Sequence, residues 1–190
     1  MNAQRKVIIG VILFVVFLII ADLAYNTLSQ NYNQFNFVEP VTYSIPNTQA
    51  IKTPDFTIFD AKGNQIHLSD FIGKPVVLNF WASWCSPCKS EMPHFNKAYA
   101  TYKNDVIFIM VDLTDGQRET QVLGQAYVNE QGYTFPVYFD NKQSASKAYN
   151  IRSIPATYII DSNGNMISNY EGAIDEKTLT SAIDTITSAK

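Results

Sequence analysis

Apolar and polar residues are unevenly distributed along the chain, and the densest apolar run comes first. Residues 7–21, VIIGVILFVVFLIIA, carry no charged or polar side chain. They are preceded by Arg5 and Lys6 and followed by Asp22. Because the run is apolar on all sides, it is typical of a membrane-directing segment rather than of an amphipathic helix on a protein core.

The length of this run fits both a membrane anchor and a removable signal peptide. A helix continued to Tyr25 would place the basic residues on the cytoplasmic side and the bulk of the chain outside, as the positive-inside rule requires. The pairs Ile19/Ala21 and Asp22/Ala24 fit a cleavage site poorly, since such a site needs small residues at both positions. We therefore expect an uncleaved single-pass anchor in the cell membrane at residues 1–25, with a cleaved signal peptide as the alternative.

The next segment, residues 26–50, shows no period of 2 or 3.6 residues and contains one charged residue, Glu39. Asn, Gln, Thr and Ser dominate it, so we interpret it as an extended spacer. It leads into the folded domain, which we expect at residues 51–190.

From Thr53 onward, short apolar runs alternate with helical patterns. Strands joined by helices predict an α/β sandwich with a mixed sheet, whose last two strands are antiparallel around a turn at 161–164. The predicted strands are 54–60, 65–68, 75–81, 105–111, 135–139, 156–160 and 166–170. The predicted helices are 88–103, 117–131, 144–149 and 175–188.

Composition narrows the function classes. The chain has 190 residues, 46% of them hydrophobic, which is enough apolar material for one core. Its net charge of −3 argues against nucleic-acid binding, which needs a basic face. Only two cysteines are present, so any sulfur chemistry belongs to that one pair.

Those cysteines, Cys85 and Cys88, directly follow the predicted central strand and open a helix. Unpaired N–H groups at a helix start stabilise a thiolate, which predicts Cys85 as the exposed nucleophile. Cys88, one turn further on, would resolve the mixed disulfide. A zinc half-site and a purely structural disulfide are the alternatives; zinc would need further ligands, and the chain offers only His67 and His94. We predict no metal and no cofactor.

Three stretches together resemble the thioredoxin superfamily, and more closely its membrane-anchored TlpA and ResA-type thiol-disulfide oxidoreductases. They are PDFTIFDAKGNQIHLSDF, GKPVVLNFWASWCSPCKSEMPHF and YNIRSIPATYIIDSNGNMI, and the resemblance covers roughly residues 53–188. It implies a thioredoxin-like three-layer sandwich with an N-terminal β-hairpin at 56–68 and a helix–strand insertion at 117–139.

The resemblance also implies roles for single residues. Cys85 and Cys88 match the redox pair, and Pro155 matches a proline that is cis in this fold. The backbone of Ile154 would pair with an extended substrate segment. The remaining substrate-binding residues that we expect are Trp84, Ser86 and Pro87.

One acidic residue completes the predicted site. Glu91 matches the acid of the CxPCxxE pattern in the TlpA and ResA group, whereas Asn79 stands where thioredoxin has a buried aspartate. A buried carboxyl with a raised pKa could accept the proton of Cys88. The alternative is that Glu91 is a solvated helix residue.

The sequence therefore predicts an enzyme that exchanges a Cys85–Cys88 dithiol or disulfide with cysteine-containing proteins outside the cytoplasm. The family resemblance favours a reductant with a membrane electron donor of the CcdA or DsbD type, and apocytochrome c is one possible substrate. Three alternatives remain: a disulfide-forming oxidase, a peroxiredoxin-like peroxidase and a non-enzymatic metal-binding assembly factor. The peroxidase would need Thr where this chain has Ala82.

Overall fold

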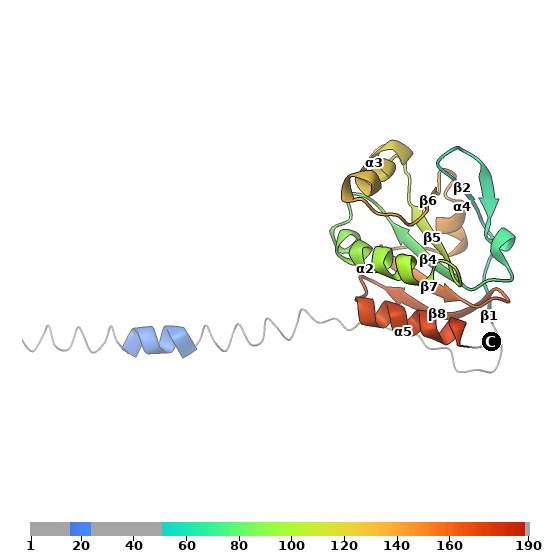
Figure 1. The fold of residues 1–190 in the computed structure, drawn as a ribbon. Helices are drawn as coiled ribbons and strands as arrows, with labels where there is room; N and C mark the ends of the chain where they lie inside the picture. Colours follow the sequence, from blue (N-terminus) through green and yellow to red (C-terminus); the bar gives the residue numbers. More distant parts are fainter. Residues whose placement is uncertain (1–15, 24–50, 189–190) are drawn as a thin grey trace, which may run out of the picture. The chain divides into compact units, whose positions relative to one another are not determined.

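The computed structural model describes residues 16–23 and 51–188 (Figure 1). Residues 16–23 are helical with exposed side chains and belong to the predicted anchor. Within the described ranges, no helix combines the length and apolar character needed to cross a membrane. The rest of the predicted anchor and the predicted spacer lie outside the described residues.

An eight-stranded sheet forms the centre of the domain, in the order β1-β8-β7-β4-β5-β6-β2-β3. β4 pairs in parallel with β5, and β5 with β6, while the other neighbours are antiparallel. The predicted mixed sheet is thereby confirmed. The strands are β1 (Ile51–Lys52), β2 (Thr57–Phe59), β3 (Gln65–His67), β4 (Val76–Trp81), β5 (Ile107–Asp112), β6 (Val137–Phe139), β7 (Ala156–Ile160) and β8 (Asn165–Glu171).

The central strand β4 explains why the sheet forms where it does. All six of its side chains are buried, because helices and loops cover both faces of the sheet at this position. Its one polar residue, Asn79, is fully buried and needs hydrogen-bond partners inside the protein. This strand ends just before the two cysteines.

Within residues 51–188, four α-helices and one 3-10 helix accompany the strands, and α5 follows the last of them. They are α2 (Ser86–Tyr102), α3 (Gln121–Gln131), α4 (Ser144–Ala148), α5 (Glu176–Thr187) and η1 (Leu68–Phe71). Asp175 is the N-cap of α5, and its carboxylate accepts a hydrogen bond of 2.7 Å from the Thr178 N–H. Gly132 ends α3 with φ 69°, a left-handed conformation that favours glycine.

The two faces of the sheet carry separate apolar cores. Helices α2, α3 and α5 pack on one face, around Trp81, Phe95 and Leu179. Helix α4 and the hairpin β2–β3 pack on the other, around Phe80 and Tyr149. The predicted three-layer sandwich is confirmed, with the N-terminal hairpin and the α3–β6 insertion in place (Figure 1).

Two helices begin two or more residues away from the predicted start, both for local reasons, and the other helix boundaries agree with the prediction to within one residue. α2 begins at Ser86 rather than Cys88, because Cys85 is its N-cap and Pro87 fits the first turn. α3 begins at Gln121 rather than residue 117. The Asp115 carboxylate accepts the N–H groups of Gln117 and Glu119 at 2.8 Å each, and this makes a turn of the preceding residues.

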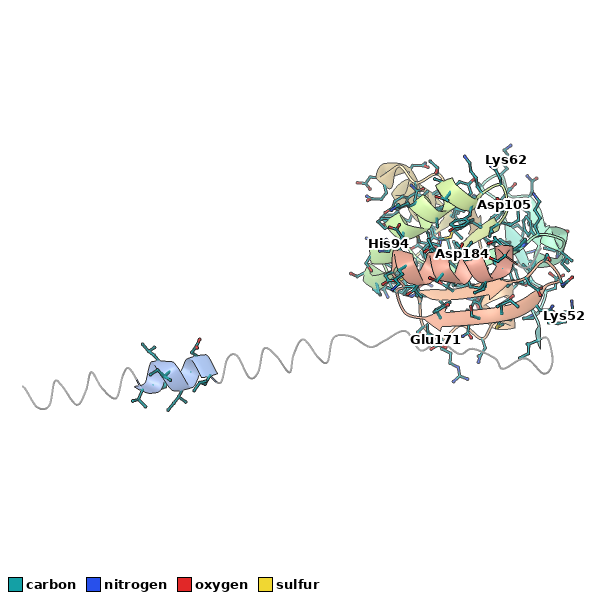
Figure 2. All side chains as sticks on the ribbon, turned by 60° about the horizontal axis from the view of Figure 1, so that its bottom comes forward. Lys52, Lys62, His94, Asp105, Glu171 and Asp184 are labelled. Atoms are coloured by element: carbon teal, nitrogen blue, oxygen red, sulfur yellow. A yellow bond between two sulfur atoms is a disulfide. The ribbon has the colours of Figure 1, made fainter. Side chains whose placement is uncertain are left out.

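Most charged side chains lie outside the core, as Lys52, Lys62 and Glu171 do at the periphery of the domain in Figure 2. Among the residues that the structure describes, four acidic ones are buried instead: Glu91, Asp112, Glu119 and Asp140. Asp140 is explained by the start of α4, where it accepts the N–H groups of Ala145 and Ser146 at 3.1 and 2.8 Å. The other three are described below with the cysteine pair.

Candidate active site

The two cysteines form a disulfide at the start of α2, directly after β4. Cys85 is the N-cap, and its Sγ accepts a hydrogen bond of 3.2 Å from the Cys88 N–H. That N–H is one of the unpaired donors at the start of a helix, and it would stabilise a thiolate on Cys85 in the reduced protein. The geometry is that of a nucleophile followed by a resolving cysteine.

The predicted exposure of Cys85 is wrong for the disulfide form. Only 3% of Cys85 is exposed, and Cys88 is fully buried. The Sγ of Cys85 lies 3.7 Å from the carbonyl oxygen of Ile154, so the loop before β7 covers it. Ser86 and Pro87 are exposed beside it, as expected for a surface that meets a substrate.

The loop that covers Cys85 contains the one cis peptide bond of the described residues, between Ile154 and Pro155. The cis prediction for Pro155 is therefore confirmed. Pro155 is buried and Ile154 is half-buried. The predicted pairing of Ile154 with a substrate strand stays a prediction.

Glu91 lies on α2, one turn after Cys88, and only 1% of it is exposed. One carboxylate oxygen accepts a hydrogen bond of 2.9 Å from Asn79 Nδ2, and the other accepts one of 3.0 Å from the Ile174 N–H. Burial raises the pKa of Glu91 to about 7, and the two hydrogen bonds oppose this shift. The interpretation of Glu91 as a solvated residue is wrong.

Asn79 therefore has a partner that the sequence alone did not identify. Its Nδ2 donates to Glu91 and also to Thr157 Oγ1, at 3.1 Å. These contacts tie the central strand β4 to α2 and to β7. The amide keeps the carboxyl of Glu91 in place without adding a second titrating group.

Trp84 immediately precedes the nucleophile and is 40% exposed. The guanidinium of Arg118 lies 3.6 Å from the centroid of its ring, a cation–π contact. Trp81, by contrast, is fully buried in the core. The sequence pattern did not indicate Arg118, because it belongs to the turn before α3, far from the motif in the chain.

A second acidic site contacts the loop between β4 and Cys85. One oxygen of the buried Glu119 accepts two hydrogen bonds from Ser83, 2.8 Å from its N–H and 2.7 Å from its hydroxyl. Asp112 lies at the end of β5, opposite Trp81 in the sheet, and is also fully buried. Neither carboxyl oxygen of Asp112 has a hydrogen-bond partner among the residues that the structure describes.

Burial, together with the charges of Glu119 and Asp115, raises the pKa of Asp112 to about 9. Asp112 is therefore protonated at neutral pH. The sequence pattern did not indicate that Asp112 and Glu119 belong to the site. The only sign of this pair in the sequence was a polar residue, Asp112, at the end of a buried strand.

In the part of the chain that the structure describes, no group of three or more His, Cys, Asp and Glu side chains could hold a metal ion. Both carboxyl oxygens of Glu91 accept hydrogen bonds, from the Asn79 amide and the Ile174 N–H, and one oxygen of Glu119 accepts from Ser83. The Cys85–Cys88 disulfide can exchange with thiols, and the buried carboxyl of Glu91 lies one turn after Cys88 on the same helix.

The chain is similar in sequence or in fold to known proteins. Thiol-disulfide oxidoreductase ResA of Geobacillus kaustophilus is 31% identical over 186 residues, which cover 98% of this chain and 99% of that protein. Thioredoxin-like protein YneN of Bacillus subtilis is 34% identical over 134 residues, or 70% of this chain and 77% of that protein. The crystal structure of StoA from Bacillus subtilis superposes with a TM-score of 0.60 at 26% identity, covering 71% of this chain and 99% of StoA.

The family assignment agrees with the geometry. A disulfide at the start of a helix, beside a cis proline and one turn before a buried acid, is compatible with the thiol-disulfide exchange that the name of ResA describes. Residues 50–168 match the AhpC/TSA family, so the chain belongs to this family and is a ResA-like thiol-disulfide oxidoreductase of the thioredoxin superfamily.

Proposed function

We propose that this enzyme works outside the cytoplasm as a membrane-anchored reductant of cysteine-containing proteins. The observation that carries the proposal is Glu91, a buried carboxyl one turn after Cys88 whose pKa is raised to about 7. Such a group can take a proton near neutral pH, as the resolving step requires. The apolar run at 7–21 supports the anchor, and the alignment with ResA over 98% of the chain includes this region.

In the proposed cycle, the Cys85 thiolate attacks a substrate disulfide and forms a mixed disulfide, while one substrate sulfur leaves as a thiolate. Glu91 then accepts the proton of Cys88, and the Cys88 thiolate attacks the Cys85 sulfur. The second substrate sulfur leaves, and the Cys85–Cys88 disulfide forms. Two electrons have passed to the substrate, whose sulfurs are now thiols.

A second dithiol must then reduce the enzyme. Because the domain faces away from the cytoplasm, we propose a membrane protein of the CcdA or DsbD type as this donor, and apocytochrome c as a candidate substrate. The exposed Trp84, Ser86 and Pro87 and the Ile154–Pro155 loop would contact the substrate. A backbone strand added at Ile154 would align the substrate cysteine with Cys85.

The reduction potential of the full-length chain in detergent tests the direction of electron flow. The protein is equilibrated with defined ratios of dithiol to disulfide, and its own disulfide is measured by alkylation. A value near that of thioredoxin, about −270 mV, supports the reductant, whereas one near that of DsbA, about −120 mV, overturns it in favour of the oxidase.

Two further assays on the same preparation test the remaining alternatives. Turnover of hydrogen peroxide by the reduced protein would support the peroxidase, and Cu⁺ binding by the reduced Cys85–Cys88 pair would support the assembly factor. For the proposed function, we expect neither. A Cys88→Ser variant should instead accumulate as a mixed disulfide with protein substrates, because the resolving thiol is absent.

A further inference from the structure

The acidic pair Asp112–Glu119 is not needed for the exchange cycle above, and yet it touches the loop that carries the nucleophile. Both residues are fully buried. A buried carboxyl costs several kcal/mol unless it is neutral or well hydrogen-bonded. Because this cost is borne by two neighbouring acids, we searched for a function of the pair.

The backbone of α3 at Gly124 lies against both carboxyls. A Cβ added to Gly124 would stand 1.9 Å from Asp112 Oδ2 and 3.4 Å from Glu119 Oε1. Oxygens of both acids therefore face the same point of the α3 backbone. The two carboxyls are neighbours in a site that the glycine leaves just wide enough for them.

The two acids differ in their contacts. Glu119 accepts two hydrogen bonds on one oxygen, both from Ser83, and such bonds stabilise a carboxylate. Asp112 accepts none through its side chain from any residue that the structure describes. Asp112 is the acid of the pair that holds its proton at neutral pH, because burial and the neighbouring charges of Glu119 and Asp115 raise its pKa to about 9.

Ser83 connects Glu119 to the redox centre. It stands two residues before Cys85, so the two Cα atoms are at most ~7 Å apart. The intervening turn is closed by the Cys85 N–H, which donates to the carbonyl oxygen of Ala82 at 3.1 Å. A carboxylate that holds both donors of Ser83 thus fixes the chain directly ahead of the nucleophile.

We propose that Glu119 is a positioning residue for the redox pair, which fixes Ser83 ahead of Cys85 and whose buried negative charge disfavours the Cys85 thiolate. A less stable thiolate makes the dithiol form less stable relative to the disulfide, and so makes the dithiol a stronger reductant. This inference rests on thiol-disulfide exchange at Cys85. It does not require a particular substrate.

The charged groups around Glu119 act in different directions. Asp115 is exposed and adds negative charge, while Arg118 is exposed and stacks on Trp84. Water and salt screen these two surface charges, whereas the buried Glu119 is screened far less. Asp112, when protonated, adds no charge.

The test compares Glu119→Gln with the wild type, both as the full-length chain in detergent. Gln keeps an oxygen that can accept from Ser83 but removes the charge. We expect the pKa of the Cys85 thiol, followed by alkylation rate against pH, to fall by about half a unit or more. The equilibrium constant for reduction of the disulfide by glutathione should rise about threefold or more. No change in either quantity would overturn the proposal.

Three variants separate charge from structure. Asp112→Asn keeps the Glu119 charge and should leave the Cys85 pKa unchanged; a fall as large as that of Glu119→Gln would overturn the assignment to Glu119. Glu119→Asp keeps the charge and should restore the wild-type pKa. If Glu119→Gln does not fold, the double variant Asp112→Asn with Glu119→Gln supplies two amides that can hydrogen-bond, and it must show the same fall.

Failure of this proposal is distinguishable from failure of the proposed function. The direction of electron flow is decided by the potential of the wild type. The role of Glu119 is decided by the difference between variant and wild type, whatever that potential is.

Discussion

Two buried acidic sites lie on either side of the cysteine pair in the chain's contacts, Glu91 one turn after Cys88 and Glu119 on Ser83 before Cys85, and their carboxyls are partnered differently. Glu91 has a hydrogen bond on each oxygen, from Asn79 and from the Ile174 N–H, and burial raises its pKa only to about 7. Asp112 has no side-chain partner among the described residues and faces Glu119, and its pKa is raised to about 9.

The difference in hydrogen-bond partners explains why two buried carboxyls of one core hold their protons over different pH ranges. Donors to Glu91 stabilise its charged form, so it can gain and lose a proton near neutral pH. Asp112 has no such donors and lies beside another acid, so it keeps its proton across the physiological range. We therefore propose that Glu91 transfers protons, whereas the total charge of the pair Asp112–Glu119 stays constant near neutral pH.

The largest effect on stability should come from Asp112→Asn. Between pH ~4, where an unfolded aspartate ionises, and pH ~9, the folded protein holds a proton that the unfolded chain has lost. Stability therefore falls as pH rises through this window. Asn removes the penalty, so at pH 7 the free energy of unfolding should rise on the order of 3 kcal/mol, measured by urea denaturation.

The pH range above 7 separates the two acidic sites. Glu91 contributes a fall in stability only between pH ~4.5 and about 7, where its folded and unfolded forms differ in protonation. Wild type and Glu91→Gln should therefore both lose stability from pH 7 to 9, and Asp112→Asn should lose less. Equal slopes in all three proteins would show that Asp112 is ionised in the fold.

The next largest effect is kinetic and concerns Glu91→Gln. Without a base beside it, Cys88 should resolve the mixed disulfide about a hundredfold more slowly near pH 7, a typical loss for a general base. Stopped-flow measurement of mixed-disulfide decay against pH gives the rate. The same substitution at Glu130, which is exposed on α3, is the matched control. A pH profile for Glu91→Gln that equals the wild-type profile would exclude the base role.

A steric change tests the tight fit around Asp112. In Gly124→Ala, the new Cβ would stand 1.9 Å from Asp112 Oδ2, so the carboxyl or α3 must shift. We expect a loss of about 2 kcal/mol of stability, despite the ~1 kcal/mol by which alanine favours a helix over glycine.

A double-mutant cycle provides the control for this clash. In Asp112→Ala with Gly124→Ala, the carboxyl is absent and alanine should no longer destabilise α3. If Gly124→Ala costs as much in the double variant as alone, the contact with Asp112 is not the cause.

The smallest effect should come from Arg118→Gln. Loss of the cation–π contact with the exposed Trp84 should reduce stability by about 0.5 kcal/mol and increase quenching of tryptophan fluorescence by acrylamide. Lys142→Gln is the control, because Lys142 lies over Phe59 at 5.1 Å and not over a tryptophan. Unchanged quenching in Arg118→Gln would show that Arg118 does not cover Trp84 in solution.

Local pattern was enough to predict most of the fold and the centre of the site. The apolar run of β4 and the helix that follows place Cys85 and Cys88 at a helix start without any long-range information. The cis Pro155 was predicted from the resemblance rather than from spacing. Helix starts were misplaced where a side chain closed a turn, as Asp115 does before α3.

The order of the elements and the identity of the redox pair follow from the sequence alone, because the hydrophobic period and the CxxC spacing are local properties. The protonation states of Glu91 and Asp112 depend on contacts that exist only in the folded protein. Burial and partners come from residues distant in the chain: Asn79 and Ile174 meet Glu91, and Ser83 meets Glu119. A carboxyl's pKa depends on those neighbours and on the loss of water, and neither can be read from the residues beside it.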